Sequence, residues 1–386
     1  MTELERLIAE LCPDGVECVN LGDIASIGVG QDPTNISEGD IPFVNAGTTP
    51  SGFLSDSNTA QDTVTTPSRG QGGIGYVGYQ KDRFWCGPLC YRIQGKKELV
   101  NNRYLYFYMT SRAENIVGLA NMTGVPALNR KELIGLRIAL PPLPIQNEIV
   151  RILDNFAELT AELTAELTAR KKQYEYYSRE ILTFDNNVKI IKLGDVLQSK
   201  GYIRGPFGSA LKKEYFTKKG IPVYEQQHAI YDSRIFRYFV DDERAKSLKR
   251  FFVKPDDLII SCSGTIGKIS IIHQNDFIGI INQALLILRL DLSKVIIKYV
   301  KYYLECFTDL IVCSKGGAIT NIEKREVIEN IMIPVPSLAE QERIVAILDR
   351  FDTLTTDISN GLPAEIAARQ KQYEYYRDKL LTFKEV

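Results

Sequence analysis

The sequence predicts an α+β protein with an internal repeat, in which each half is a mixed α/β domain followed by a long helix. Three observations support this. The stretch KKQYEYYSREILTF at 171–184 returns as QKQYEYYRDKLLTF at 370–383. The stretch PPLPIQNEIVRILDNF at 141–156 matches PSLAEQERIVAILDRF at 336–351. The segments that precede these blocks are rich in glycine and aromatic residues and resemble one another only faintly, so the helical parts are the more faithful copies.

Length and charge limit the class of protein. A chain of 386 residues is long enough for two or three units that each bury a core. It carries 47 basic and 48 acidic residues, for a net charge of −1. The chain as a whole is therefore not a basic nucleic-acid binder, although single surfaces can still be strongly positive.

Composition also predicts location and argues against metal chemistry. No run of about 18 apolar residues occurs, and the first residues, MTELERLIAELCPDG, carry acids where a signal peptide would be basic and then apolar. We therefore expect a cytoplasmic protein with no membrane contact. The seven cysteines include no CxxC pair and the chain has two histidines. Neither a disulfide framework nor a zinc site is expected, and no cofactor is predicted.

The segments before the helices have the patterns of strands and short helices. In DDLIISCSGTIGKISII, at 256–272, two apolar runs flank a Ser/Gly turn, which predicts two strands joined by a short loop. The stretch DTVTTPSRGQGGIGYVGY at 62–79 predicts the same arrangement with a longer, glycine-rich loop. Amphipathic helices are expected at 101–112 and 296–307. Both segments are therefore predicted to be mixed α and β domains.

The long helices are predicted from apolar residues spaced three or four apart. In the first, this stripe comprises Ile145, Ile149, Ile152, Phe156, Leu159, Leu163 and Leu167. Such a stripe is typical of a coiled-coil seam, but it is also typical of a helix packed on its own domain. The length favours the coiled coil, because about 38 helical residues would span roughly 57 Å. The second helix contains Gly361 and Pro363, which predict a kink or a break and restart.

Three stretches resemble catalytic motifs, and each departs from its motif in spacing or in residue type. SGTIGKIS, at 263–270, does not have the spacing of a phosphate-binding loop. KPDDLII, at 254–260, is not followed by the acid and lysine of a metal-dependent nuclease, and LPPLP, at 140–144, lacks the polar and aromatic residues of an adenine methylation motif. No catalytic centre is predicted.

Other side chains are of the types that bind DNA. Arginine and glutamine read base edges, and clustered lysines bind phosphates, although an ordinary solvated surface is the alternative for each residue taken singly. A locally basic stretch occurs in the second domain at residues 200–219, where Glu214 is the one acid. The predicted DNA-binding residues are Ser68, Arg69, Gln71, Arg204, Lys212, Lys213, Gln226, Gln227, His228, Ser263, Thr265 and Lys268.

Taken together, the duplicated blocks resemble the specificity subunit of type I restriction-modification systems. The motifs that carry the resemblance are the LPPLPIQ and IVRILDNF helix entry, the repeated TAEL units at 156–170 and the duplicated KQYEYY stretch. The resemblance implies two target-recognition domains, separated by two helices that form an antiparallel coiled coil with approximate two-fold symmetry. The implied segments are 1–142 and 187–336 for the domains, and 143–186 and 337–386 for the helices.

The same resemblance implies what the protein does. Each recognition domain would read one half of a bipartite target in double-stranded DNA, while the helices set the distance between the domains. The helices would also dock methyltransferase subunits, two in number, and restriction subunits with helicase and nuclease activity would join through them. The chain itself would neither cut nor methylate, because the S-adenosylmethionine and ATP sites belong to those partners.

The repeat gives a reason for the duplicated tyrosines. A pseudo-two-fold chain offers two similar docking surfaces, so the same motif can meet the same kind of neighbour twice. Helical spacing cannot place three such tyrosines on one face, so we expect one of each set to point inward and the others outward. The predicted docking residues are Tyr174, Tyr176, Tyr177, Tyr373, Tyr375 and Tyr376.

A second class of protein could also contain the two long helices and is the alternative interpretation of the sequence. A coiled-coil scaffold, or a DNA mimic that inhibits restriction, would bind only protein and read no bases. It would not need two large, divergent domains with arginine and glutamine in their loops. The near-neutral net charge departs from a typical DNA-binding protein, and it suggests that partner subunits supply part of the positive potential.

Overall fold

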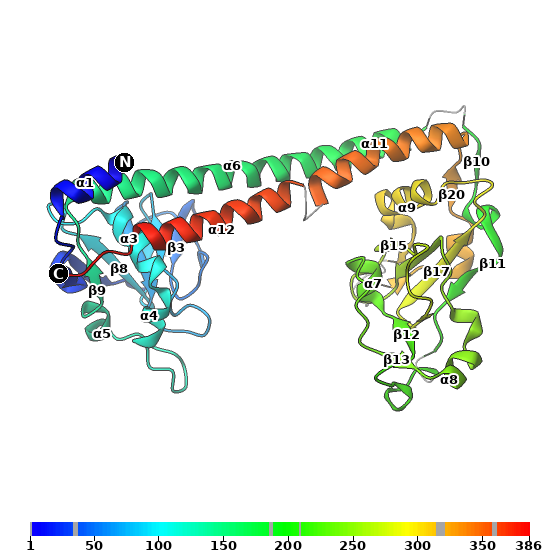
Figure 1. Ribbon diagram of the computed structural model, residues 1–386, viewed down its shortest axis with the longest axis horizontal. Helices are drawn as coiled ribbons and strands as arrows, with labels where there is room; N and C mark the ends of the chain where they lie inside the picture. The colour runs from blue at the N-terminus through cyan, green and yellow to red at the C-terminus, as the bar shows by residue number, and fades with distance from the viewer. Residues whose placement is uncertain (1, 34–37, 185–187, 208–209, 314–320, 357–360) are drawn as a thin grey trace. The chain divides into compact units, whose positions relative to one another are not determined.

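The computed structural model describes residues 2–33, 38–184, 188–207, 210–313, 321–356 and 361–386 (Figure 1). The chain divides into two compact units. The first unit comprises Met1–Ala165 together with Glu365–Val386, and the second comprises Glu166–Ala364. These units cut across the predicted linear segments, because each contains one domain and a part of both helical blocks.

The first unit is built on a four-stranded antiparallel sheet. Its strand order is β2-β8-β5-β6, with bounds Ala25–Val29, Cys90–Gly95, Thr63–Pro67 and Gly78–Gln80. A three-stranded sheet of order β4-β3-β7 has bounds Gly52–Leu54, Ile41–Val44 and Trp85–Cys86, and β1 (Cys18–Asn20) pairs with β9 (Arg137–Ala139). The short helices are α1 (Glu3–Leu11), α2 (Leu21–Ile24), α3 (Asn102–Ser111), α4 (Ala113–Gly118) and α5 (Arg130–Ile134).

The second unit repeats the strand orders of the first and adds one further strand pair. Its four-stranded sheet, β11-β17-β14-β15, has bounds Leu197–Arg204, Leu285–Leu290, Asp257–Ser261 and Ile269–Ile271. The smaller sheet, β13-β12-β16, has bounds Phe239–Val240, Ile221–Tyr224 and Ile280–Ile281. Two pairs complete the strands: β10 (Ile190–Lys192) with β20 (Met332–Pro334), and β18 (Val312–Cys313) with β19 (Asn321–Ile322).

The short helices of the second unit connect these strands. The α-helices are α7 (Gln226–Ile230), α8 (Asp242–Ser247), α9 (Ile297–Cys306) and α10 (Arg325–Glu329). The 3-10 turns are η1 (Leu193–Val196), η3 (Lys213–Tyr215), η4 (Lys249–Phe251) and η5 (Thr308–Leu310). The predicted strand pairs and the predicted helices at 101–112 and 296–307 are confirmed as β5 with β6, β14 with β15, α3 and α9.

Three longer helices complete the chain. The first, α6, runs without interruption over Leu143–Leu182, as the apolar stripe predicts. The second block forms two helices, α11 (Leu338–Thr356) and α12 (Leu362–Leu380), and residues 357–360 between them lie outside the described residues. The predicted restart near Pro363 is confirmed, because this proline is the second residue of α12, where the absence of its N–H costs no helical hydrogen bond.

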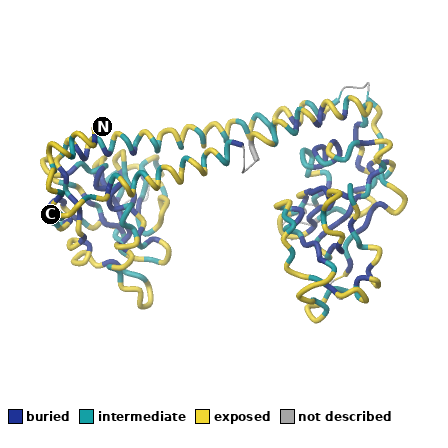
Figure 2. Tube along the Cα trace, viewed as in Figure 1, coloured by how far each residue is buried: buried dark blue, intermediate teal, exposed yellow. Residues whose placement is uncertain are grey.

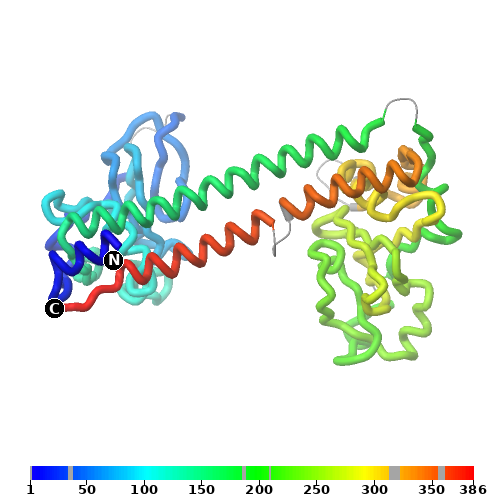
Figure 3. The backbone as a smooth tube through the Cα atoms, turned by 45° about the horizontal axis from the view of Figure 1, so that its top comes forward, coloured from blue at the N-terminus to red at the C-terminus, as the bar shows by residue number. Residues whose placement is uncertain are grey.

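Within each unit, parts of two helices lie side by side and antiparallel (Figures 1 and 3). In the first unit, Phe156 of α6 stacks on Tyr376 of α12, with ring centroids 5.4 Å apart. In the second unit, Tyr174 of α6 contacts Phe351 of α11, with centroids 6.2 Å apart. The predicted α+β fold with antiparallel coiled-coil helices and an internal repeat is confirmed.

The beginning of each helical block also packs into its own domain. In α6, the buried Ile145, Ile149 and Leu153 belong to the core of the first unit, and in α11 Ile344 and Leu348 belong to that of the second. Figure 2 colours the chain by burial, and along the long helices buried positions are interspersed with half-buried and exposed ones. The apolar residues at the start of each helical block therefore pack in a domain core, and those further along the block pack between the paired helices. Among the described residues, no helix is both long and apolar enough to cross a membrane.

Candidate nucleic-acid interface and domain-to-helix junctions

The loop between β5 and β6 carries the first group of predicted DNA-binding residues, and its backbone is braced on two sides. The N–H of Ser68 donates to the carbonyl of Leu89 at 2.8 Å, and the N–H of Leu128 donates to the carbonyl of Ser68 at 2.9 Å. Arg69 and Gln71 are exposed. Gly70 and Gly72 have φ values of 119° and 83°, which only glycine adopts readily. The loop is therefore fixed while its long polar side chains project.

The equivalent loop between β14 and β15 is held by a serine at its base. The hydroxyl of Ser261 donates to the carbonyl of Thr265 at 2.6 Å and accepts from the N–H of Lys268 at 3.0 Å. Ser263 donates to Oε1 of Gln226 at 3.1 Å, so the structure brings these two predicted residues together. Thr265 and Lys268 are exposed on the same loop.

His228 does not fit the predicted role in base reading. It is fully buried on α7, and its ring stacks on Phe236 with centroids 4.7 Å apart. Its Nδ1 accepts from the N–H of Glu225 at 2.8 Å, and its Nε2 lies 3.2 Å from the carbonyl oxygen of Ile235. Burial lowers the pKa of the imidazole. The histidine therefore stabilises the start of α7 as a neutral side chain.

Gln227 is half-buried beside the same carboxylate. Its Nε2 lies 3.4 Å from Oε2 of Glu225, which also accepts from Arg237. The guanidinium of Arg237 lies 3.0 Å from Glu225 Oε1, and the arginine side chain is largely exposed. A partly buried acid thus neutralises one arginine next to the predicted contact residues. Sequence analysis missed Arg237 because no local pattern marks it.

The basic stretch, residues 200–219, includes the end of β11 and the turn η3. Arg204 ends β11, and its Nη1 is buried without a hydrogen-bond partner among the described residues. Lys212 and Lys213 are exposed at η3. Lys212 lies 3.7 Å from Glu214, but both side chains are solvated, so this ion pair contributes little to stability.

A buried glutamine fixes each domain to its helix. In the first unit, Oε1 of Gln146 accepts from the N–H of Asn101 at 2.8 Å, and Nε2 donates to the carbonyls of Leu99 and Pro141 at 2.9 and 2.7 Å. Gln341 makes the equivalent contacts in the second unit, to Ile296, Lys294 and Pro336. Both amides are fully buried. Sequence comparison of the two halves marks these glutamines as repeated but gives no indication of their partners.

Beside each glutamine, an aspartate on the long helix binds the short helix of the domain. Arg103 of α3 donates to Asp154 of α6 through Nε and Nη2, at 2.8 and 2.6 Å. The guanidinium also lies over the rings of Tyr79, Tyr106 and Phe107, within 4.9 Å of each centroid. In the second unit, Asp349 of α11 accepts from Lys298 and Tyr302 of α9, at 2.7 and 2.6 Å. The aspartate therefore occupies the equivalent position in both helices, but it binds an arginine in the first unit and a lysine and a tyrosine in the second.

The tyrosines divide between the interior and the surface as predicted in one copy only. In the first copy, Tyr174 is half-buried against Phe351, whereas Tyr176 is 64% exposed and Tyr177 is also exposed. In the second copy, Tyr373 packs on the core of the first unit and Tyr376 stacks on Phe156, which leaves Tyr375, at 62%, as the exposed member. The prediction of two outward tyrosines is wrong for the second copy, because α12 presents both residues to the first unit.

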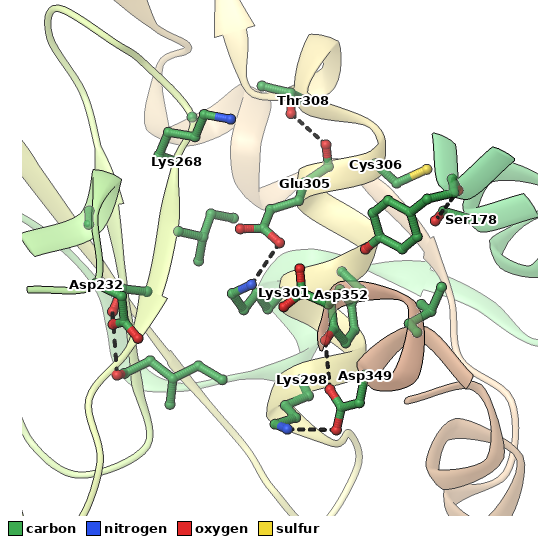
Figure 4. Close-up of a pocket in the computed structure, with 18 of the residues that line it drawn as sticks. Ser178, Asp232, Lys268, Lys298, Lys301, Glu305, Cys306, Thr308, Asp349 and Asp352 are labelled. Carbon is green, nitrogen blue, oxygen red and sulfur yellow. Dashed lines mark hydrogen bonds and ion pairs between the residues drawn. The ribbon is translucent and has the colours of Figure 1, made fainter. Parts of the chain in front are cut away.

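The second unit contains a cleft of about 1430 Å³ between α9, β15 and the ends of α6 and α11. Its lining is of mixed charge, and Figure 4 shows Glu305 and Lys301 pointing toward one another. Their ion pair is 2.8 Å long, and burial raises the pKa of Glu305. No group of three His, Cys, Asp or Glu side chains that could hold a metal occurs among the described residues. The cleft offers no recognisable catalytic constellation.

Comparison with known proteins identifies the family. The Type I restriction modification DNA specificity domain matches residues 13–170 and 185–368, which is most of the chain. The chain therefore belongs to this family. It is 35% identical over 326 residues to S.HindORF215P of Haemophilus influenzae, assigned as a type I restriction enzyme specificity subunit, covering 78% of this chain and 77% of that one.

Further relatives agree. The EcoR124I/EcoR124II specificity subunit of Escherichia coli is 36% identical over 248 residues, which cover 62% of this chain and 60% of that protein. Among solved structures, the S subunit of a type I restriction-modification system from M. genitalium has a TM-score of 0.58 and 17% identity, over 96% of this chain and 97% of that one. A chain from a structural study of assembly and conformational transition in a type I system has a TM-score of 0.67, also at 17% identity, over 96% and 98%. These structures share the fold.

Proposed function

We propose that the protein is the sequence-specific DNA-binding subunit of a type I restriction-modification complex. The observation that carries the proposal is that the four-stranded and three-stranded sheets have the same strand order in two domains whose glycine-rich loops differ in sequence. Each domain would read one half of a bipartite target, and the divergent loops would make the two halves different. Family membership argues against the alternative of a scaffold or DNA mimic that reads no bases.

Arg69, Gln71, Gln226, Ser263, Thr265 and Lys268 are the proposed contacts near base edges. Arginine can donate two hydrogen bonds to one base, and glutamine can donate one and accept one, which is how sequence is read directly. Lys212, Lys213 and Arg204 would contact phosphates. Gln227 could contact a base only after its hydrogen bond to Glu225 breaks. His228 is not proposed as a DNA contact, because it is buried.

The partners follow from the same proposal. The duplicated helices would dock two methyltransferase subunits, and restriction subunits would join through them. The exposed Tyr176, Tyr177 and Tyr375 are the proposed docking residues, while the more buried tyrosines would hold the helices in place. We also propose that the chain has no catalytic activity of its own, with S-adenosylmethionine and ATP bound by the partners. A cytoplasmic location remains a prediction.

Reconstitution tests this function. The purified chain, incubated with S-adenosylmethionine and target DNA, should transfer no methyl group until a methyltransferase partner is added. Genome-wide mapping of methylated sites should then show a bipartite target. Replacing residues 1–142 with the same segment of a related subunit should alter one half of that target only. Methyl transfer by the chain alone, or alteration of both halves, would contradict the proposal.

A further inference from the structure

The first unit contains a loop, residues 121–126, that the sequence did not single out. It is closed at its base by two backbone hydrogen bonds, from the N–H of Asn121 to the carbonyl of Ala127 at 2.8 Å and from the N–H of Ala127 to the carbonyl of Asn121 at 3.0 Å. The N–H of Gly70 donates to the carbonyl of Pro126 at 3.0 Å. This loop and the β5–β6 loop are therefore paired through their backbones, although some fifty residues separate them.

A third segment joins them from β3. Residues 45–51 follow this strand, and the carbonyl oxygen of Ala46 lies so close to Gly73 that a Cβ on this glycine would meet it at 2.1 Å. The side chain of Asn45 accepts from the N–H of Leu89 at 2.9 Å, the residue whose carbonyl also holds Ser68. Three segments far apart in the sequence thus form one surface around Arg69.

The charge of this surface is unusual for the chain. The three segments, residues 45–51, 68–77 and 121–127, contain no aspartate or glutamate, although 48 of the 386 residues are acidic. Arg69 is the only charged residue in these three segments. A surface without carboxylates suits a polyanion, because a single buried carboxylate facing a phosphate would oppose binding.

The tip of the loop is apolar and exposed. Met122 and Val125 are 57% and 60% exposed, and a Cβ on the intervening Gly124 would meet nothing within 4 Å. The N–H of Thr123 donates to Oδ1 of Asn121 at 2.9 Å, which fixes the turn. Apolar side chains in DNA-binding loops contact the thymine methyl group in the major groove or enter a base step from the minor groove.

We propose that residues 121–126 form a third DNA-reading segment of the first recognition domain, with Met122 and Val125 in apolar contact with bases of its half-site. This inference rests on the proposed function, which supplies duplex DNA as the ligand. The backbone pairing with Ser68 to Gly70 places the apolar tip beside Arg69. One surface would therefore combine the guanidinium of Arg69, polar groups and the apolar side chains of Met122 and Val125. The loop would distinguish bases of the half-site that Arg69 alone does not distinguish.

The test uses the complex reconstituted with methyltransferase subunits, on DNA that carries the target mapped for the wild type. The double variant Met122→Ala/Val125→Ala should weaken binding to the target roughly five- to hundredfold, and should relax one or two positions of the first half-site while the second half-site stays unchanged. The matched control is Leu99→Ala, since Leu99 is 41% exposed in the same unit and follows Glu98 outside this surface.

A second pair of variants introduces a negative charge at the same two positions, Val125 and Leu99. Val125→Glu places a carboxylate on the surface without acids and should reduce target binding more than Leu99→Glu, with the difference shrinking as salt is raised. Thermal unfolding of each variant shows whether the fold is retained. If the alanine variant keeps the wild-type target and affinity, or loses affinity for target and random DNA equally, the inference is overturned while the proposed function stands. If the wild-type complex reads no sequence at all, the proposed function itself fails.

Discussion

The side chain of Gln146 accepts a hydrogen bond from the backbone N–H of Asn101, 2.8 Å away, and so ties the start of α3 to the start of α6. Gln341 holds Ile296 at the same distance and the same separation of 45 residues. Each glutamine amide is buried and also donates to two carbonyls. Both domains are therefore fixed to their helices by the same set of hydrogen bonds. The orientation of a domain on its helix is thereby set at the same point in both copies.

Replacing Gln146 with leucine should destabilise the first unit. The change leaves the N–H of Asn101 and the carbonyls of Leu99 and Pro141 without these hydrogen bonds, at a cost of about 1–3 kcal/mol for each group that water cannot reach. Hydrogen exchange of the Asn101 amide and denaturant unfolding measure the effect. Gln372→Leu, on the exposed face of α12, is the control and should change the free energy of unfolding by less than about 0.5 kcal/mol. Equal effects from both variants would remove the role assigned to Gln146.

The second unit should lose stability as the pH falls below the ordinary histidine pKa. Burial lowers the pKa of His228 in the folded state, so the unfolded chain binds the proton more readily. The contribution of His228 is therefore complete above about pH 6.5 and is lost progressively as the pH falls toward the folded-state pKa. Urea unfolding between about pH 5.5 and 7.5 should show this slope.

His228→Gln should reduce that slope, whatever it does to stability at neutral pH. The control is His273→Gln, because His273 is exposed and is the only other histidine in the chain. A slope that disappears in the His273 variant, or persists unchanged in the His228 variant, would refute the assignment.

Lys212→Ala and Lys213→Ala should weaken binding to all DNA sequences alike. A lysine that neutralises a phosphate releases about one counterion, so each change should flatten the dependence of log affinity on log salt by about one unit. Binding of the reconstituted complex to target and random duplexes over a range of salt concentrations measures this. Lys97→Ala, an exposed lysine in the first unit, is the control and should leave the salt dependence unchanged.

Arg69→Ala should instead relax one position of the target. Loss of a paired contact with a base edge costs about 1–3 kcal/mol for the correct base and little for the others. Methylation profiling against a library of altered half-sites would reveal the position. If Arg69→Ala weakens random DNA as much as the target, Arg69 contacts phosphate and not a base.

Deleting one TAEL unit, Thr164–Leu167, should shorten the unread spacer of the target by one base pair. Because α6 is continuous through these residues, the deletion removes about 6 Å and about 400° of helix, a residual rotation near 40°. One base-pair step turns the duplex by about 35° and rises about 3.4 Å, so rotation favours one base pair while length alone lies between one and two. Genome-wide mapping of methylated sites reads the spacer directly. Replacing the same four residues with alanines keeps the length of the helix and should keep the spacer; an unchanged spacer after deletion would mean that α6 does not set it.

The sequence alone determined the repeat, the strand pairs at the two glycine-rich loops and the continuity of α6. These features depend on the spacing of apolar residues and glycines within short stretches of the chain, which the sequence shows directly. The hydrophobic stripe did not show that Ile145 and Ile149 serve a domain core while Phe156 meets Tyr376, since both positions have the same spacing. The glycine-rich loop predicted Arg69 but not its neighbours.

Only the tertiary structure placed the loop at residues 121–126 beside Arg69, buried His228 against Phe236 and gave Gln146 its partners. Each of these depends on contacts between residues that are distant in the chain or on opposite sides of a turn. A polar residue in a loop has the same local pattern whether it projects into solvent or satisfies a buried backbone group. Burial and hydrogen-bond partners separate the two cases, and both are properties of the folded chain.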